Sequence, residues 1–80
     1  MSDDSTPAVR LDLRGLKCPL PALRTRKALK QAAPGQLFLV ECTDPLSTIA
    51  IPNLLRETGD ELEAQESAER LHVFRIRRRN

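Results

Sequence analysis

The chain has 80 residues, of which 40% are hydrophobic and 30% are charged, and its net charge is +2. This length predicts one small domain and leaves no room for a second. The only aromatic residues are Phe38 and Phe74, so stacking of bases on aromatic rings, and with it sequence-specific nucleic-acid binding, is not expected. The longest apolar run, 37–40, is far below the about 20 residues of a membrane span.

The first eight residues are small, polar and partly acidic, which predicts a mobile tail (1–8) before a single domain at 9–80. A secretory signal would need a basic end and an apolar centre, so we expect a cytoplasmic protein that does not bind membranes. In that reducing compartment Cys18 and Cys42 would be free thiols. We also expect a monomer.

Apolar and polar residues alternate over 9–14, which predicts a strand with one buried face that Gly15 ends. A helix is predicted from Cys18-Pro19, because proline suits the first helical position. It should run to about Ala33, before the Pro34-Gly35 stop. The apolar run 37–40, within 36–43, predicts a central strand.

Asp44-Pro45 predicts a second helix, with aspartate as N-cap and proline at its first position. Apolar residues follow at positions 46, 49, 50 and 54, and Pro52 should kink the helix. Leu62 and Ala64 alternate with polar residues in a third strand, and 71–78 should form a fourth.

This order of elements, βαβαββ, predicts the α+β class and a two-layer α/β sandwich with a four-stranded mixed sheet. The first two strands should be parallel through a right-handed crossover, and the last two should form an antiparallel hairpin. Two helices would then cover one face of the sheet. The glutamates of the third strand would line the open face.

The segment around Cys18 is the one that indicates chemistry. Cys18 falls at the N-cap of the first helix or one residue before it, where unpaired N–H groups and the helix dipole favour the nucleophilic thiolate. Pro19 and Pro21, at the first and third helical positions, would stiffen the first turn, while Arg14 and Lys17 add positive charge. The alternative is a buried, inert cysteine beside a rigid turn.

Three further residues leave alternatives open. Cys42 should lie at the same sheet edge as Cys18, either as a small core residue or as a resolving thiol. His72 is expected to be structural or solvent-exposed. The spacing of both cysteines with Asp44 and His72 matches no familiar zinc pattern, so neither a metal site nor a bound cofactor is expected.

Over residues 9 to about 78, the chain resembles the TusA family, also called SirA-like. The matching elements are Leu11-Asp12, Gly15-Leu16, Cys18-Pro19-x-Pro21, Arg26-Lys27, Pro34-Gly35, Asp44-Pro45, Ile51-Pro52, Gly59 with Glu61, and Phe74-x-Ile76-Arg77. The chain departs from the family at Asp60, where a histidine is common, and at Cys42, where many members have no thiol.

The resemblance implies a sulfurtransferase-like sulfur carrier whose Cys18 accepts sulfane sulfur as a persulfide. It also implies a cysteine desulfurase or a rhodanese-like protein as donor and a downstream acceptor protein, in tRNA thiolation or another sulfur pathway. Two alternatives remain at this point: a non-catalytic interaction module of the same fold, and a dithiol redox protein using Cys18 and Cys42.

The basic residues near Cys18 are a second candidate feature. Between Asp12 and Glu41 the chain has no acid, and these bases are either ordinary solvated surface or a face that docks an acidic partner. The residues expected to dock a partner are Arg14, Lys17, Arg26 and Lys27.

Overall fold

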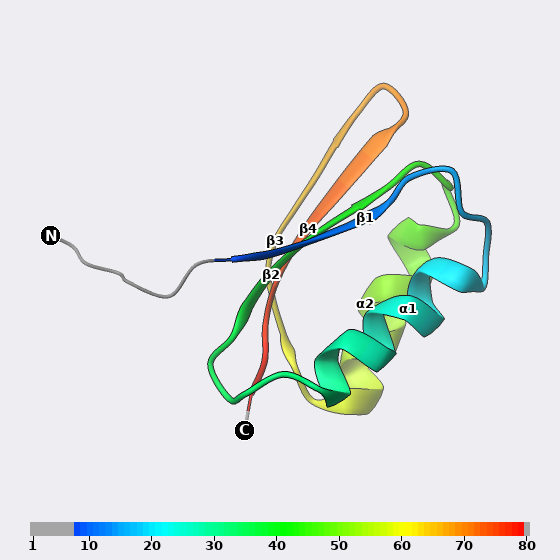
Figure 1. Cartoon of the computed structure of the whole chain (residues 1–80). Coiled ribbons are helices and arrows are strands. Elements are labelled where there is room, and N and C mark those ends of the chain that lie inside the picture. Colours follow the sequence, from blue (N-terminus) through cyan, green and yellow to red (C-terminus); the bar gives the residue numbers. More distant parts are fainter. Residues whose placement is uncertain (1–7, 80) are drawn as a thin grey trace, which may run out of the picture.

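The computed structural model describes residues 8–79. Two strand–helix units and a final hairpin form a sheet with both helices on one face (Figure 1). The elements are β1 (Val9–Leu13), α1 (Leu20–Lys30), β2 (Leu37–Cys42), α2 (Ser47–Thr58), β3 (Glu61–Ala68) and β4 (Leu71–Arg77). Residues 1–7 of the predicted tail lie outside the described residues.

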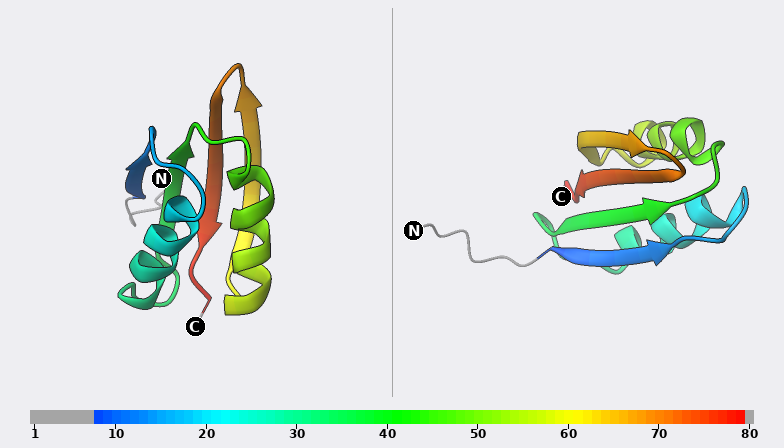
Figure 2. Two further views of the ribbon diagram at one scale, coloured as in Figure 1. Left: turned by 90° about the vertical axis from the view of Figure 1, so that its right-hand side faces the viewer. Right: turned by 90° about the horizontal axis from the view of Figure 1, so that it is seen from above.

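The sheet order β1-β2-β4-β3 confirms the predicted fold class. β1 and β2 are parallel, with Leu13 beside Cys42, and the other two pairs are antiparallel. Because parallel strands end at the same edge of a sheet, the loops that follow β1 and β2 meet there. Both helices also begin at that edge (Figure 2). The topology therefore brings the Cys18 loop and the Thr43–Leu46 loop together.

The hydrophobic core lies between the helices and the sheet. Phe74 and Ile76 of β4 are both fully buried there. The core cluster consists of Leu13, Leu29, Phe38, Val40, Cys42, Ile51, Leu55, Phe74 and Ile76. Each large apolar side chain buried in this way stabilises the fold by about 1.5–3 kcal/mol.

A β-bulge in β3 changes the predicted alternation of that strand. Leu62 pairs with Ile76 but Ala64 pairs with Arg75, so the two apolar residues do not share a face as expected. Glu63, the extra residue at the bulge, forms ion pairs with Arg75 at 3.2 Å and with Arg77. These pairs place Glu63 on the open face, as the sequence predicted for the glutamates of this strand.

Both helices begin later than the sequence predicts, and α1 also ends earlier. α1 begins at Leu20 and ends at Lys30, not near Ala33, because the Gln31 and Ala32 N–H groups donate to carbonyls three residues earlier and tighten the last turn. α2 begins at Ser47, after a hydrogen-bonded turn in which the Ser47 N–H donates to the Asp44 carbonyl at 3.0 Å. The helix continues through Pro52 to Thr58. Within residues 8–79, neither helix has the length and apolar character to cross a membrane.

Candidate functional site

The loop between β1 and α1 presents Cys18 at the protein surface. Gly15 has a φ of 84°, a left-handed conformation that glycine adopts without strain. The Leu16 N–H then donates to the Leu13 carbonyl at 3.2 Å, and the Leu20 N–H donates to the Lys17 carbonyl at 2.8 Å. These two turns leave Cys18 exposed, which excludes the buried cysteine considered above.

The two prolines stand one position earlier in the helix than predicted. Pro19 is the N-cap residue and Pro21 is the second residue of α1. The helix begins only at Leu20, because residues 17–20 form a hydrogen-bonded turn before it. Cys18 therefore lies one residue before the N-cap. The Cys18–Pro19 peptide bond is cis. Pro21 is fully buried, so this proline also packs the first turn against the protein.

Side chains of the β2–α2 loop hold the Cys18 loop in place. The Gly15 N–H donates to the Thr43 hydroxyl at 2.8 Å, and the Cys18 N–H donates to Oδ2 of Asp44. Oδ1 of the same carboxylate accepts the Leu46 N–H at 3.2 Å. The sequence identified Asp44 only as a helix cap; its bond to Cys18 was missed, because the partners are 26 positions apart.

The two thiols have opposite environments. Cys42 is fully buried at the end of β2 and belongs to the core, and burial raises the pKa of its thiol. Of the two alternatives for Cys42, the structure supports the small core residue. Both cysteines are free.

We expect iodoacetamide to alkylate Cys18 at least about tenfold faster than Cys42 in the folded protein, because Cys42 must first be exposed by local opening. The rates would be measured separately in the Cys42→Ser and Cys18→Ser variants. In denaturant the difference should largely disappear. Similar rates in the native protein would contradict the buried position of Cys42.

The basic residues predicted to dock a partner differ in their surroundings. Arg14 forms a bidentate pair with Asp12, at 2.7 and 2.9 Å, and its hydrogen bonds lower the pKa of Asp12 to about 2. Asp12 thus offsets the charge of Arg14. Lys17, Arg26 and Lys27 are exposed, and none of the three forms an ion pair within the described chain. These three remain the stronger docking candidates.

Four exposed apolar side chains lie at the starts of the two helices, at the sheet edge where the Cys18 loop also lies. Leu20 and Leu23 lie on the first turns of α1, and Leu46 and Ile49 lie at the start of α2. Their exposed fractions are 41%, 54%, 53% and 61%, respectively. We call these four residues the apolar patch.

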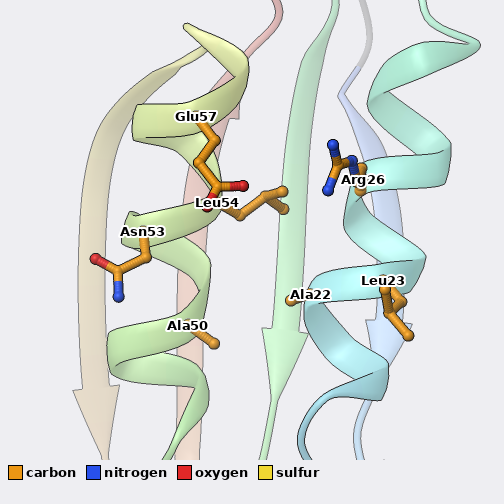
Figure 3. Close-up of a pocket in the computed structure, with 7 residues that line it drawn as sticks. All are labelled: Ala22, Leu23, Arg26, Ala50, Asn53, Leu54 and Glu57. Atoms are coloured by element: carbon orange, nitrogen blue, oxygen red, sulfur yellow. The ribbon is translucent and has the colours of Figure 1, made fainter.

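An open groove runs between α1 and α2 beside the apolar patch (Figure 3). Ala22 and Ala50 line its walls with small side chains, and Leu23 joins it to the apolar patch. Figure 3 shows Arg26 and Glu57 projecting into the groove from opposite walls, although they form no ion pair. The groove between the two helices therefore combines apolar walls with one basic and one acidic side chain.

The remaining candidate residues make structural contacts. His72 on β4 hydrogen-bonds the Ser67 hydroxyl through Nδ1 at 2.8 Å, which supports a structural interpretation. Asp60 has a fully buried side chain that pairs with Arg78 and accepts the Arg79 N–H at 2.9 Å. Among residues 8–79, no three metal-ligating side chains gather at one point.

Comparisons with known proteins agree with this fold. The profile of the family described as Sulfurtransferase TusA matches residues 9–78. The Sulfur carrier protein TusA of Allochromatium vinosum is 41% identical over 65 residues, which cover 80% of this chain and 86% of that protein. The crystal structure of a SirA-like protein from Desulfitobacterium hafniense has the same fold, with a TM-score of 0.75 at 22% identity. The match covers 90% of this chain and 99% of that one.

Proposed function

Since the chain belongs to the TusA family of sulfurtransferases, we propose that it carries sulfane sulfur as a persulfide on Cys18 and passes it to an acceptor protein. The observation that supports this proposal best is the exposure of Cys18 on a loop fixed by the neighbouring loop. A carrier needs such a thiol, because the same sulfur must reach into two different active sites. The buried Cys42 does not meet this requirement.

The transfer needs only thiol and persulfide chemistry. The Cys18 thiolate attacks the terminal sulfur of a cysteine persulfide on the donor. A sulfur–sulfur bond forms at Cys18, the donor's sulfur–sulfur bond breaks, and its electron pair leaves on the donor thiolate. In the second half, an acceptor thiolate attacks the terminal sulfur of the Cys18 persulfide in the same way. Atoms and electrons balance without an external oxidant or a bound cofactor.

The donor in this proposal is a cysteine desulfurase or a rhodanese-like protein. The acceptor is a protein of a sulfur relay that leads to tRNA thiolation or to another sulfur pathway. A reducing cytoplasm suits this role, because both thiols are free and the carrier has to start as a thiolate.

We propose that partners dock on the helix side of Cys18, over the apolar patch. Exposed apolar side chains gain free energy when a partner covers them. Lys17, Arg26 and Lys27 would guide an acidic partner toward this surface and set its orientation. Arg14 should contribute less than these three, because Asp12 already pairs with it.

The test is incubation of the protein with a cysteine desulfurase and cysteine, followed by mass spectrometry of the intact chain. We expect the mass of one sulfur atom to be added to the parent and to Cys42→Ser, and none to Cys18→Ser. A reductant should remove the added sulfur. If Cys18→Ser is loaded as well as the parent, or if loading requires Cys42, the proposed role of Cys18 is wrong.

A further inference from the structure

The Asp44 side chain connects the backbone of Cys18 to the loop that follows β2. Its two carboxylate oxygens serve different loops: Oδ2 accepts the Cys18 N–H and Oδ1 accepts the Leu46 N–H. The Asp44 residue is only partly exposed. The Thr43 hydroxyl accepts the Gly15 N–H and so holds the start of the Cys18 loop. The Cys18 loop is thus held at two points by side chains of the loop that follows β2.

We propose that Asp44 is a positioning residue for sulfur transfer: its carboxylate fixes the backbone of Cys18, and so the direction from which the sulfur meets a partner's active site. This inference rests on the proposed function. The reacting sulfurs must approach in line inside another protein, and a displacement of about 1 Å at a reacting centre can cost up to about 100-fold in rate. A bond to the backbone of the nucleophile limits such displacement.

A positioning role and a purely electrostatic role predict opposite effects. Loss of one negative charge near a nucleophile that reacts as an anion does not by itself slow its attack, so loss of the Asp44 charge alone would leave Cys18 at least as reactive. If Asp44 acts through the hydrogen bond to Cys18, its loss should slow sulfur transfer even though one negative charge has been removed. The sign of the change therefore separates the two roles.

The variant Asp44→Asn tests the hydrogen bond with little change in shape. An asparagine amide has one acceptor oxygen and one NH₂ group, which can only donate. Its oxygen can accept a hydrogen bond from the Cys18 N–H or from the Leu46 N–H. The N–H that is left faces the NH₂ group and loses its acceptor. Asp44→Ser is the second variant. A serine hydroxyl can accept the Leu46 N–H in the turn before α2, but the side chain is too short to replace both carboxylate oxygens.

Asp12→Asn is the matched control. It also removes one negative charge at the end of a parallel strand, but Asp12 pairs with Arg14 and makes no bond to Cys18. Thermal unfolding of all three variants would show that each one folds.

The experiment measures single-turnover sulfur transfer from a cysteine desulfurase persulfide over a range of desulfurase concentrations. For Asp44→Ser we expect the maximal rate to fall by about tenfold, and for Asp44→Asn by a smaller factor because its one acceptor oxygen can serve only one of the two N–H groups; the half-saturating concentration should stay within about twofold of the parent. Alkylation of Cys18 by iodoacetamide should not slow, because a small reagent reaches the thiol in any loop position. Asp12→Asn should behave as the parent.

Amide hydrogen exchange at Cys18 provides a readout that needs no partner. In Asp44→Ser this exchange should be at least about tenfold faster than in the parent, and in Asp12→Asn it should be unchanged. Parental maximal rates in both Asp44 variants, or unchanged exchange at Cys18 in Asp44→Ser, would overturn the inference alone. A loss of affinity at an unchanged maximal rate would make Asp44 a docking residue and also overturn it. A parent that takes up no sulfur would overturn the proposed function as well.

Discussion

Replacing Leu23 and Ile49 together by glutamine is expected to lower the second-order rate of sulfur transfer by at least about tenfold, equivalent to about 1.4 kcal/mol. These two side chains are 54% and 61% exposed, so they contribute little to the core and the fold should survive. A docked partner would bury them beside Cys18, where a few central apolar contacts supply most of an interface's binding energy. The measurement is single-turnover persulfide transfer from a cysteine desulfurase, below saturation.

Val9→Gln is the control for this double variant. Val9 is also exposed, at 41%, but it begins β1, at the opposite end of that strand from the Cys18 loop. Its replacement should leave transfer unchanged. Equal slowing by Val9→Gln would mean that any exposed apolar residue replaced by glutamine slows transfer, and that the apolar patch has no special role. An unaffected Leu23/Ile49 variant would exclude the apolar patch from docking.

The exposure of Leu46 and Ile49 in the apolar patch was not predicted because α2 carries two overlapping apolar faces. The sequence placed residues 46, 49, 50 and 54 on one stripe, whereas the buried positions are Ser47, Ile51, Leu54 and Leu55. Both sets have helical spacing, and periodicity alone cannot tell which set meets the sheet. Which set is buried depends on the residue at which the helix begins and on where Phe38 of β2 and Phe74 of β4 lie in the core. The apolar residues of α2 that stay exposed can therefore be identified only from the structure.

The position of Cys18 was predictable, but its hydrogen bonding was not. Glycine, cysteine and proline are local signals, so the sequence placed the thiol on a loop just before α1, and the structure has it there. Which side chain accepts the Cys18 N–H is decided by the parallel pairing of β1 with β2. That pairing brings together Cys18 and Asp44, which are 26 positions apart. A contact between residues so far apart in the sequence cannot be predicted from a local sequence motif.

Charge reversal at Arg26 and Lys27, by the double variant Arg26→Glu/Lys27→Glu, is expected to slow sulfur transfer by about tenfold at low ionic strength. Both side chains are exposed and form no ion pair within residues 8–79, so their field is available to a partner. Complementary charge mainly accelerates encounter and sets orientation. Salt should therefore slow the parent, because exposed charges are screened beyond about 8 Å at physiological ionic strength. The double variant should lose most of this salt dependence.

Lys30→Glu/Arg56→Glu is the matched control, since it changes the net charge equally at the C-terminal ends of α1 and α2, with Lys30 three residues beyond Lys27. Each reversal near a helix end costs about 0.3–1 kcal/mol at most, so this control should fold and transfer sulfur nearly as the parent does. Iodoacetamide should alkylate Cys18 at the parental rate in both double variants, because docking plays no part in that reaction. If transfer is indifferent to salt and to both reversals, the bases are solvated surface. Docking then depends on the apolar patch alone.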